Sequence, residues 1–251
     1  MIHIVGAGCG AVDLITVRGR KYLEEADVII YAGSLVNPDL LVYAKEGCII
    51  HDSAKMTLEE VIGVITDAES KGLTTVRLHT GDPSLYGAIG EQMREFDRLG
   101  FEYDITPGVS AFSGAAAALK TEYTLPDVSQ TVIITRAEGK TPVPAKESLK
   151  SLASHGATMC LYLSTGLLDK ASKDLIEGGY SADTPAAIIY KASWPEEKVF
   201  RCTIGTLEET AKANNITKTA LITVGDFLGS EFARSYLYDP GFTTEFREAK
   251  K

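Results

Sequence analysis

The chain of 251 residues with a net charge of −9 at pH 7 is long enough for one large or two modest domains. The acidic balance argues against a nucleic-acid binder, which normally carries a basic face, but not against an anionic small substrate in a local basic cleft. No basic and apolar leader precedes the first strand-like segment, and no apolar run approaches the roughly 20 residues that span a bilayer. We therefore expect a soluble, cytoplasmic protein that binds neither nucleic acid nor membrane.

Apolar runs that resemble strands alternate with amphipathic segments of helical length, a pattern that favours an α/β fold with mainly parallel strands. In the first half we expect strands at 2–5, 28–31, 48–51, 74–78 and 103–106, and helices at 16–25, 58–70, 84–99 and 110–119. Asn37-Pro38 can start a short helix, Thr57–Glu60 resembles a capping box, and Gly100 can close a helix.

The pattern breaks at the polar stretch 120–127, and a second series of elements follows it. We expect strands at 131–135, 158–163, 186–190, 198–203 and 220–224, and helices at 146–154, 167–177 and 206–213. The sequence therefore predicts two α/β domains, residues 1–125 and 126–251.

The cysteines and histidines do not form a metal-binding pattern. Cys9, Cys48, Cys160 and Cys202 lie far apart and form no C-x-x-C pair, and the four histidines are scattered. We expect reduced thiols and no metal site.

Three glycine-containing turns follow predicted strands. The first, Gly6-Ala-Gly8-Cys-Gly10-Ala11, matches the G-x-G-x-x-G/A spacing of dinucleotide-binding turns. Two features count against such a site: Val12–Leu14 delays the helix, and the second strand ends in Tyr31-Ala-Gly33 without an acid for a ribose hydroxyl. A nucleotide-dependent oxidoreductase is thus the weaker alternative.

The second turn is Gly81-Asp82-Pro83 and the third is Pro107-Gly108-Val-Ser110-Ala111. Read alone, Asp82 is an N-cap and Pro83 the first residue of a helix. In open parallel sheets, however, ligands bind beyond the carboxyl ends of the strands, where both turns are expected to lie.

The three turns, in this order, resemble those of the tetrapyrrole (porphyrin and corrin) methyltransferase family, from Ile2 to about Val224. Three further segments resemble the branch that methylates precorrin-4 or cobalt-precorrin-4 at C11: Tyr31–Val36, Thr135–Pro144 and Tyr190–Glu197. The resemblance implies two α/β domains with a cofactor cleft between them, a homodimer, and S-adenosylmethionine as methyl donor, released as S-adenosylhomocysteine. The first domain would supply the substrate trough and part of the cofactor site, and the second the adenosine side.

Carried over position by position, the resemblance implies a set of cofactor-binding residues: Cys9, Thr80, Gly81, Asp82, Leu85, Ser110, Ala111, Leu163, Ala192 and Gly225. Relatives that methylate uroporphyrinogen carry an acid after the second strand, but this chain has Ala32 there. The catalytic base, if the reaction needs one, therefore stays unassigned.

A corrin substrate carries many carboxylates, for which planar, bidentate cations are suitable partners. The candidate substrate-binding residues, each at or beside a family-like motif, are Arg18, Tyr86, Phe112, Arg136 and Lys191. Trp194 either covers the macrocycle or packs a loop. Sequence does not decide whether the substrate contains cobalt, whether another corrin or porphyrin intermediate is methylated, or whether the chain only senses the cofactor.

Overall fold

The computed structural model describes residues 1–250, which form two compact units. The first unit comprises Met1–Ala115 and Lys191–Glu197, and the second comprises Ala116–Tyr190 and the described residues from Lys198 onward. The chain thus passes between units inside helix α4 (Ala111–Leu119), ahead of the predicted boundary at residue 125. The reason is that α4 packs in two directions: its beginning contacts the first glycine turn, whereas the carbonyl of Leu119 near its end accepts a hydrogen bond from Arg201, 3.2 Å away.

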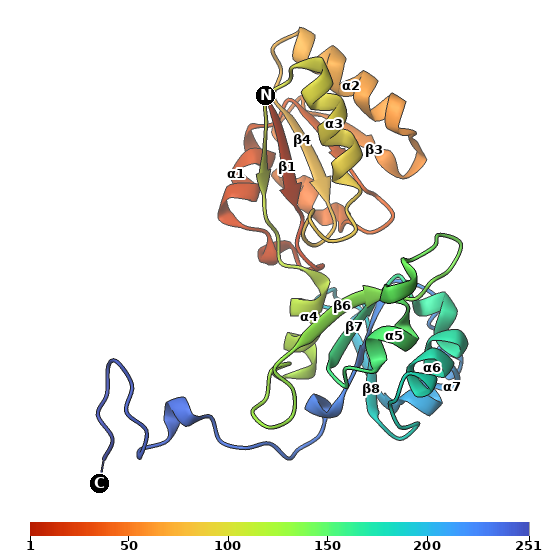
Figure 1. The fold of residues 1–251 in the computed structure, drawn as a ribbon. Coiled ribbons are helices and arrows are strands. Elements are labelled where there is room, and N and C mark those ends of the chain that lie inside the picture. The colour runs from red at the N-terminus through yellow and green to blue at the C-terminus, as the bar shows by residue number, and fades with distance from the viewer. Residues whose placement is uncertain (251) are drawn as a thin grey trace. The chain divides into compact units, whose positions relative to one another are not determined.

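The first unit is a parallel sheet with helices on both faces (Figure 1). Its strands lie in the order β3-β2-β4-β1-β5, and every neighbouring pair is parallel. The strands are β1 (Ile2–Gly6), β2 (Val28–Tyr31), β3 (Ile49–Asp52), β4 (Thr75–His79) and β5 (Tyr103–Thr106). Because parallel strands all end at one edge, the turns that follow β4, β1 and β5 are direct neighbours.

Alternate side chains of these strands enter two separate cores. Ile2 and Ile4 pack against α2 (Leu58–Ser70) and α3 (Ile89–Leu99). Val5 and Ala7 pack with residues of α1 (Val17–Glu25) and of the 3-10 helix Pro38–Tyr43 on the other face. Burial on both faces explains why β1 has an almost continuous apolar sequence.

Several local sequence signals are confirmed. The Thr57–Glu60 capping box is formed in both directions, Pro38 begins a 3-10 helix, and Gly100 ends α3 with φ at 71°. The helix expected at 84–99 begins only at Ile89, because Tyr86 and Ala88 have φ of 57° and 51° and interrupt helical geometry. The prediction that Asp82 is a helix N-cap is therefore wrong.

The second unit has a mixed sheet in the order β6-β7-β10-β8-β9. Its strands are β6 (Val132–Arg136), β7 (Thr158–Tyr162), β8 (Pro185–Tyr190), β9 (Lys198–Thr203) and β10 (Ala220–Val224). The two-domain α/β fold is confirmed, but in this sheet only β6 and β7 are parallel and the other pairs are antiparallel. The loop between β8 and β9 is too short for the helical crossover that parallel neighbours need.

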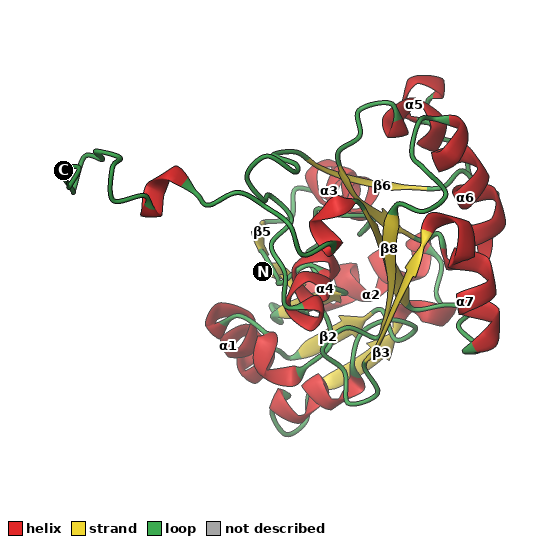
Figure 2. Cartoon of the chain, turned by 90° about the horizontal axis from the view of Figure 1, so that it is seen from below, coloured by secondary structure: helices red, strands yellow, loops and turns green. Residues whose placement is uncertain are grey.

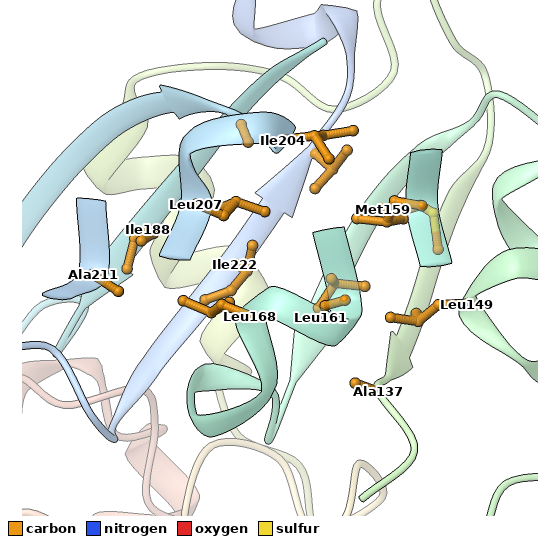
Figure 3. Packing of buried hydrophobic residues seen from close by; sticks show 14 of the residues in the cluster. Ala137, Leu149, Met159, Leu161, Leu168, Ile188, Ile204, Leu207, Ala211 and Ile222 are labelled. Atoms are coloured by element: carbon orange, nitrogen blue, oxygen red, sulfur yellow. The ribbon is translucent and has the colours of Figure 1, made fainter. Parts of the chain in front are cut away.

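Helices α5 (Leu149–Ala153), α6 (Leu168–Glu177) and α7 (Leu207–Ala213) cover one face of this sheet (Figure 2). Figure 3 shows their apolar side chains meeting those of the strands, with Leu161 and Ile222 near the centre. Both of these residues are completely buried. The second unit therefore has a hydrophobic core of its own.

The four cysteines are unpaired, as predicted, and burial raises the pKa of the Cys160 thiol to about 12. Within residues 1–250, no helix combines the length and apolar character that crossing a membrane requires.

Leu161→Ala should lower the free energy of unfolding by about 2–5 kcal/mol, because it leaves a cavity in the core of the second unit. Leu237→Ala is the control: this leucine is 65 % exposed, and its truncation should change stability by less than about 0.5 kcal/mol. Urea unfolding followed by circular dichroism measures both. A loss below about 1 kcal/mol for Leu161→Ala would show that the site repacks.

Candidate functional site

The turns that follow β1 and β4 are joined by backbone hydrogen bonds. Gly81 N donates to Gly8 O at 2.9 Å, and Gly8 N donates to Gly81 O at 3.2 Å. Ala7 N donates to His79 O at 2.7 Å, just before this bridge. The ladder between the strands thus continues into the turns and fixes the two glycine motifs against each other.

The third turn lies so close to the other two that only glycine fits. A Cβ atom on Gly6 would lie 2.6 Å from Gly108 Cα and 2.7 Å from Gly81 O. One on Gly108 would lie 2.1 Å from Gly81 O. Three segments from distant parts of the sequence are therefore in backbone contact at the carboxyl edge of the first sheet.

Asp82 ties two of these turns together. Its Oδ2 accepts a hydrogen bond from Gly108 N at 3.0 Å, and its Oδ1 accepts one from Ser84 N at 2.9 Å and another from the Ser84 hydroxyl. Burial raises the pKa of Asp82, but the bonds from Ser84 and Gly108 outweigh it and leave the pKa below its usual value. The carboxylate is thus ionised at neutral pH, with both oxygens occupied. Leu85 closes the turn by donating its amide to Asp82 O at 3.2 Å.

Small residues line the first and third turns. Ser110 Cα and Ala111 N lie 3.6 Å from the position a Cβ on Gly81 would take. At Gly114, one turn into α4, a Cβ would lie 2.7 Å from Cys9 Sγ and 3.5 Å from Ala192 Cβ. The first unit therefore brings together most of the predicted cofactor residues: Cys9, Thr80, Gly81, Asp82, Leu85, Ser110, Ala111 and Ala192.

Two polar atoms at the end of β4 are buried without a hydrogen-bond partner among residues 1–250: Thr80 Oγ1 and His79 Nε2. Burial, and then the nearby charge of Arg77, lowers the pKa of His79 to about 3, so its ring is neutral at physiological pH. Arg77 is itself buried and donates to Gln92 Oε1 at 3.0 Å and to Ile30 O at 3.1 Å. Unpaired buried polar groups are costly, and such groups beside a turn are suited to a ligand or an ordered water.

The loop Lys191–Glu197 packs on the first glycine turn within the first unit. Ser193 Oγ accepts a hydrogen bond from Ala11 N at 3.0 Å, and it lies 3.2 Å from Cys9 Sγ. A Cβ on Gly10 would lie only 2.1 Å from Cδ1 of Trp194. The indole of Trp194 therefore packs against the turn, which is one of the two roles that the sequence left open.

In the second unit, the two predicted cofactor-binding residues lie at opposite ends of the strands. Leu163 follows the end of β7, whereas Gly225 lies beside Thr158 at its beginning, 3.4 Å from Thr158 Cα to the Cβ position. Five residues of strand separate them by about 17 Å. A single adenine ring does not span that distance, so the position of Leu163 does not support Gly225 as a neighbouring contact, and both residues stay predictions. The separation arises because β10 runs antiparallel to β7.

The residues beside Leu163 come instead from the start of β10. Ala220 pairs with Tyr190 at the end of β8, and its carbonyl accepts a hydrogen bond from Thr165 Oγ1 at 3.1 Å. Leu163 is 64 % exposed with φ of 53°, and Thr219 has φ of 57°. Backbone strain of this kind in residues other than glycine is concentrated at functional sites.

The candidate substrate residues differ in their surroundings. Arg18 is exposed on the first turn of α1, and Tyr86 is 45 % exposed in the turn after β4. Phe112 is half-buried in the first turn of α4. These three belong to the first unit, whose sheet edge carries the glycine turns.

The other two cations are bonded to their own loops. Arg136 donates from its terminal nitrogens to Thr141 O at 3.1 Å and Pro142 O at 2.7 Å. Lys191 forms an ion pair of 3.3 Å with Glu196 and lies 5.0 Å from the centre of the Trp194 ring. Arg136 thus shapes the loop that follows β6, and its role toward a substrate stays a prediction.

The sequence did not indicate the two side chains from distant segments that bond the first glycine turn at Gly10 and Ala11. Besides Ser193, Asn37 donates from Nδ2 to Gly10 O at 2.9 Å, and this side chain is buried. Polar side chains after predicted strands are a weak signal, and nothing in a single sequence indicates that residues 11 and 193 are partners.

Comparison with known proteins points to one family. The sequence profile described as Tetrapyrrole (Corrin/Porphyrin) Methylases matches residues 1–208. The chain is 53 % identical over 251 residues to the cobalt-precorrin-4 C(11)-methyltransferase of Methanocaldococcus jannaschii, covering 100 % of this chain and 97 % of that protein. It is 46 % identical to the precorrin-4 C(11)-methyltransferase of Mycobacterium tuberculosis, covering 94 % of this chain and 95 % of the relative.

A solved structure gives the same result for the fold. The X-ray structure of the cobalamin biosynthetic enzyme cobalt precorrin-4 methyltransferase, CbiF, superposes with a TM-score of 0.89 at 48 % identity. The superposition covers 91 % of this chain and 96 % of that one.

Gly108→Ala should destabilise the first unit by about 1–3 kcal/mol or more, because its methyl group would overlap the Gly81 carbonyl. Gly90→Ala in α3 is the matched control: a Cβ there meets nothing within 4 Å, and the gain in helix propensity should raise stability by up to about 1 kcal/mol. Thermal unfolding should therefore move in opposite directions for the two variants. Equal melting temperatures would contradict the close contact.

Proposed function

Because the chain belongs to the tetrapyrrole (corrin/porphyrin) methylase family, we propose that it transfers the methyl group of S-adenosylmethionine to C11 of cobalt-precorrin-4, or of metal-free precorrin-4, in cobalamin biosynthesis. The observation that carries the proposal is the meeting of the Gly6, Gly81 and Gly108 turns, with Asp82 across them, in a chain 53 % identical to a cobalt-precorrin-4 C(11)-methyltransferase over its full length.

The residues around these turns fit S-adenosylmethionine. Thr80 Oγ1 is buried without a hydrogen-bond partner among residues 1–250, so it can bond a polar group of the methionine end. Asp82 is ionised and adds negative charge near a cofactor that carries a sulfonium and an ammonium group. Ser110, Ala111 and Ala192 are small enough for a ligand to approach the backbone.

When bound, the cofactor supplies a strongly electrophilic methyl group, so that the protein's task is to position the two reactants and exclude water. A reduced corrin ring is electron-rich at its enamine-like carbons, and no activated side-chain nucleophile is needed. Both carboxylate oxygens of Asp82 already accept hydrogen bonds, one from the Gly108 amide and the other from the Ser84 amide. We therefore assign Asp82 to shaping the cofactor pocket and not to removing a proton.

For the adenosine, Leu163 remains the proposed contact of the second unit. Thr219 and Ala220 replace Gly225 in the proposal, because they lie at the same sheet edge as Leu163.

For the substrate carboxylates, Arg18 is the preferred cation, with Tyr86 and Phe112 as contacts to the ring. Lys191 and Arg136 are secondary candidates, since each is already bonded within its own loop. The homodimer implied by the family resemblance and the cytoplasmic location expected from the sequence stay predictions.

Incubation with cobalt-precorrin-4 and methyl-labelled S-adenosylmethionine should give a singly methylated product whose label NMR places at C11. Metal-free precorrin-4 and uroporphyrinogen III, tested in parallel, identify the preferred ring. Calorimetry should show binding of S-adenosylhomocysteine and none of NADH. Binding of NADH alone would contradict the proposal, and binding without methyl transfer to any of the three rings would favour a sensing role.

Asp82→Asn should weaken S-adenosylhomocysteine binding about tenfold and raise the KM for the donor, because the amide NH2 would face either the Gly108 or the Ser84 amide. Turnover at saturating donor should change much less. Full affinity with lost turnover would instead identify Asp82 as a base.

The same variant gives a pH test. Because the pKa of Asp82 is lowered in the folded protein, its stabilising contribution is fully present above the pKa of the unfolded chain and is lost as the pH falls through the folded pKa. The difference in melting temperature between wild type and Asp82→Asn should thus be present at neutral pH and shrink in acid. A difference that grows in acid would contradict this assignment.

A further inference from the structure

The turn Gly8–Ala11 is held from outside by the loop Lys191–Glu197, about 180 residues away in the sequence. Ser193 accepts the Ala11 amide at 3.0 Å and contacts the Cys9 thiol at 3.2 Å. On the other side, Asn37 holds the Gly10 carbonyl at 2.9 Å. The turn is therefore fixed by side chains from two separate segments.

The loop adopts an unfavourable backbone conformation to reach the turn. Lys191 and Ser193 have φ of 47° and 64°. These values lie in the left-handed region, which residues other than Gly, Asn and Asp rarely adopt. Glu197 compensates by accepting the Ser193 amide through Oε2 at 2.6 Å, and Glu196 pairs with Lys191 at 3.3 Å. Strain that is maintained in this way indicates a constraint on the position of the Ser193 side chain.

Two proposed cofactor residues depend on this contact. Cys9 lies between Gly8 and Gly10 in the turn, and Ala192 immediately precedes Ser193 in the loop. Both pack on the same place in α4, where a Cβ on Gly114 would meet Cys9 Sγ at 2.7 Å and Ala192 Cβ at 3.5 Å. The Ser193 hydroxyl is thus the polar link between the two segments that carry these residues.

We infer that Ser193 is a positioning residue, whose hydroxyl sets the affinity for the methyl donor by holding the Cys9 turn and the Ala192 loop in register. The inference rests on the proposed function, since it concerns the same cofactor. Ser193 is not required for the chemical step, because its hydroxyl is occupied by Ala11 and Cys9.

Three substitutions separate the hydroxyl from the backbone strain. Ser193→Gly removes the hydroxyl and relieves the strain, whereas Ser193→Ala removes the hydroxyl and retains the strain. Ser193→Asn provides a side-chain oxygen on a residue that tolerates positive φ. Ser181→Gly is the control, because the Ser181 hydroxyl accepts only a local hydrogen bond from Asp183 N at 3.2 Å in an exposed turn of the second unit.

Calorimetry with S-adenosylhomocysteine and donor-dependent kinetics are the main measurements. Ser193→Gly and Ser193→Ala should both raise the Kd and the KM for the donor about tenfold, equivalent to about 1.4 kcal/mol, while kcat at saturating donor stays within about twofold. Ser193→Asn should recover most of the affinity, and Ser181→Gly should match the wild type.

Trp194 provides an independent readout, because it is the single tryptophan of the chain and packs on Gly10. The fluorescence emission of Trp194 should shift to longer wavelength in Ser193→Gly, because the loop no longer holds the turn. In Ser193→Asn the emission wavelength should return to the wild-type value.

Unchanged donor affinity in Ser193→Gly, or a loss of kcat with unchanged KM, would overturn the inference. An equal loss of donor affinity in Ser193→Gly and Ser193→Asn, at melting temperatures equal to that of the wild type, would also overturn it. If the wild-type protein itself does not bind S-adenosylhomocysteine, it is the proposed function that fails. A wild type that binds, with glycine and alanine variants that bind equally well, refutes the role of Ser193 alone.

Discussion

The contact among Gly6, Gly81 and Gly108 is the constraint on which the candidate site depends. Parallel strands β4, β1 and β5 end side by side, and their backbones approach so closely that no Cβ fits between them. The backbone amides at this contact are bonded within the protein, Gly8 and Gly81 to each other and Gly108 to Asp82, so the contact holds the three turns in a fixed arrangement. The backbone contact alone therefore determines how the three turns of the candidate site lie relative to one another.

Two side chains stabilise this arrangement by accepting backbone amides that the strand ladders leave free. Asp82 accepts those of Ser84 and Gly108, and Ser193 accepts that of Ala11. An irregular turn exposes such amides by necessity, and a buried amide without a partner is costly. The side chains therefore act on the shape of the turns, and their influence on a ligand passes through the backbone they hold.

Structural features that depend on neighbouring residues in the chain could be predicted from the sequence. Backbone conformation in the irregular turns and the direction of strand pairing could not. The capping box at Thr57 and the apolar strand β1 depend on neighbouring residues, and both were predictable. Asp82 was placed at a helix start because the left-handed residues Tyr86 and Ala88 cannot be recognised from residue type. Alternating helices and strands indicate mainly parallel pairing in the second half as well, whereas β10 is antiparallel to β7.

The difference between the two sheets changes where candidate functional positions fall in the second unit. In a parallel sheet every strand ends at one edge, but in the mixed sheet the end of β8 lies beside the start of β10. Leu163 and Thr219 both have positive φ at this edge. Two non-glycine residues with positive φ at this edge make it the better candidate for the proposed ligand contact of the second unit.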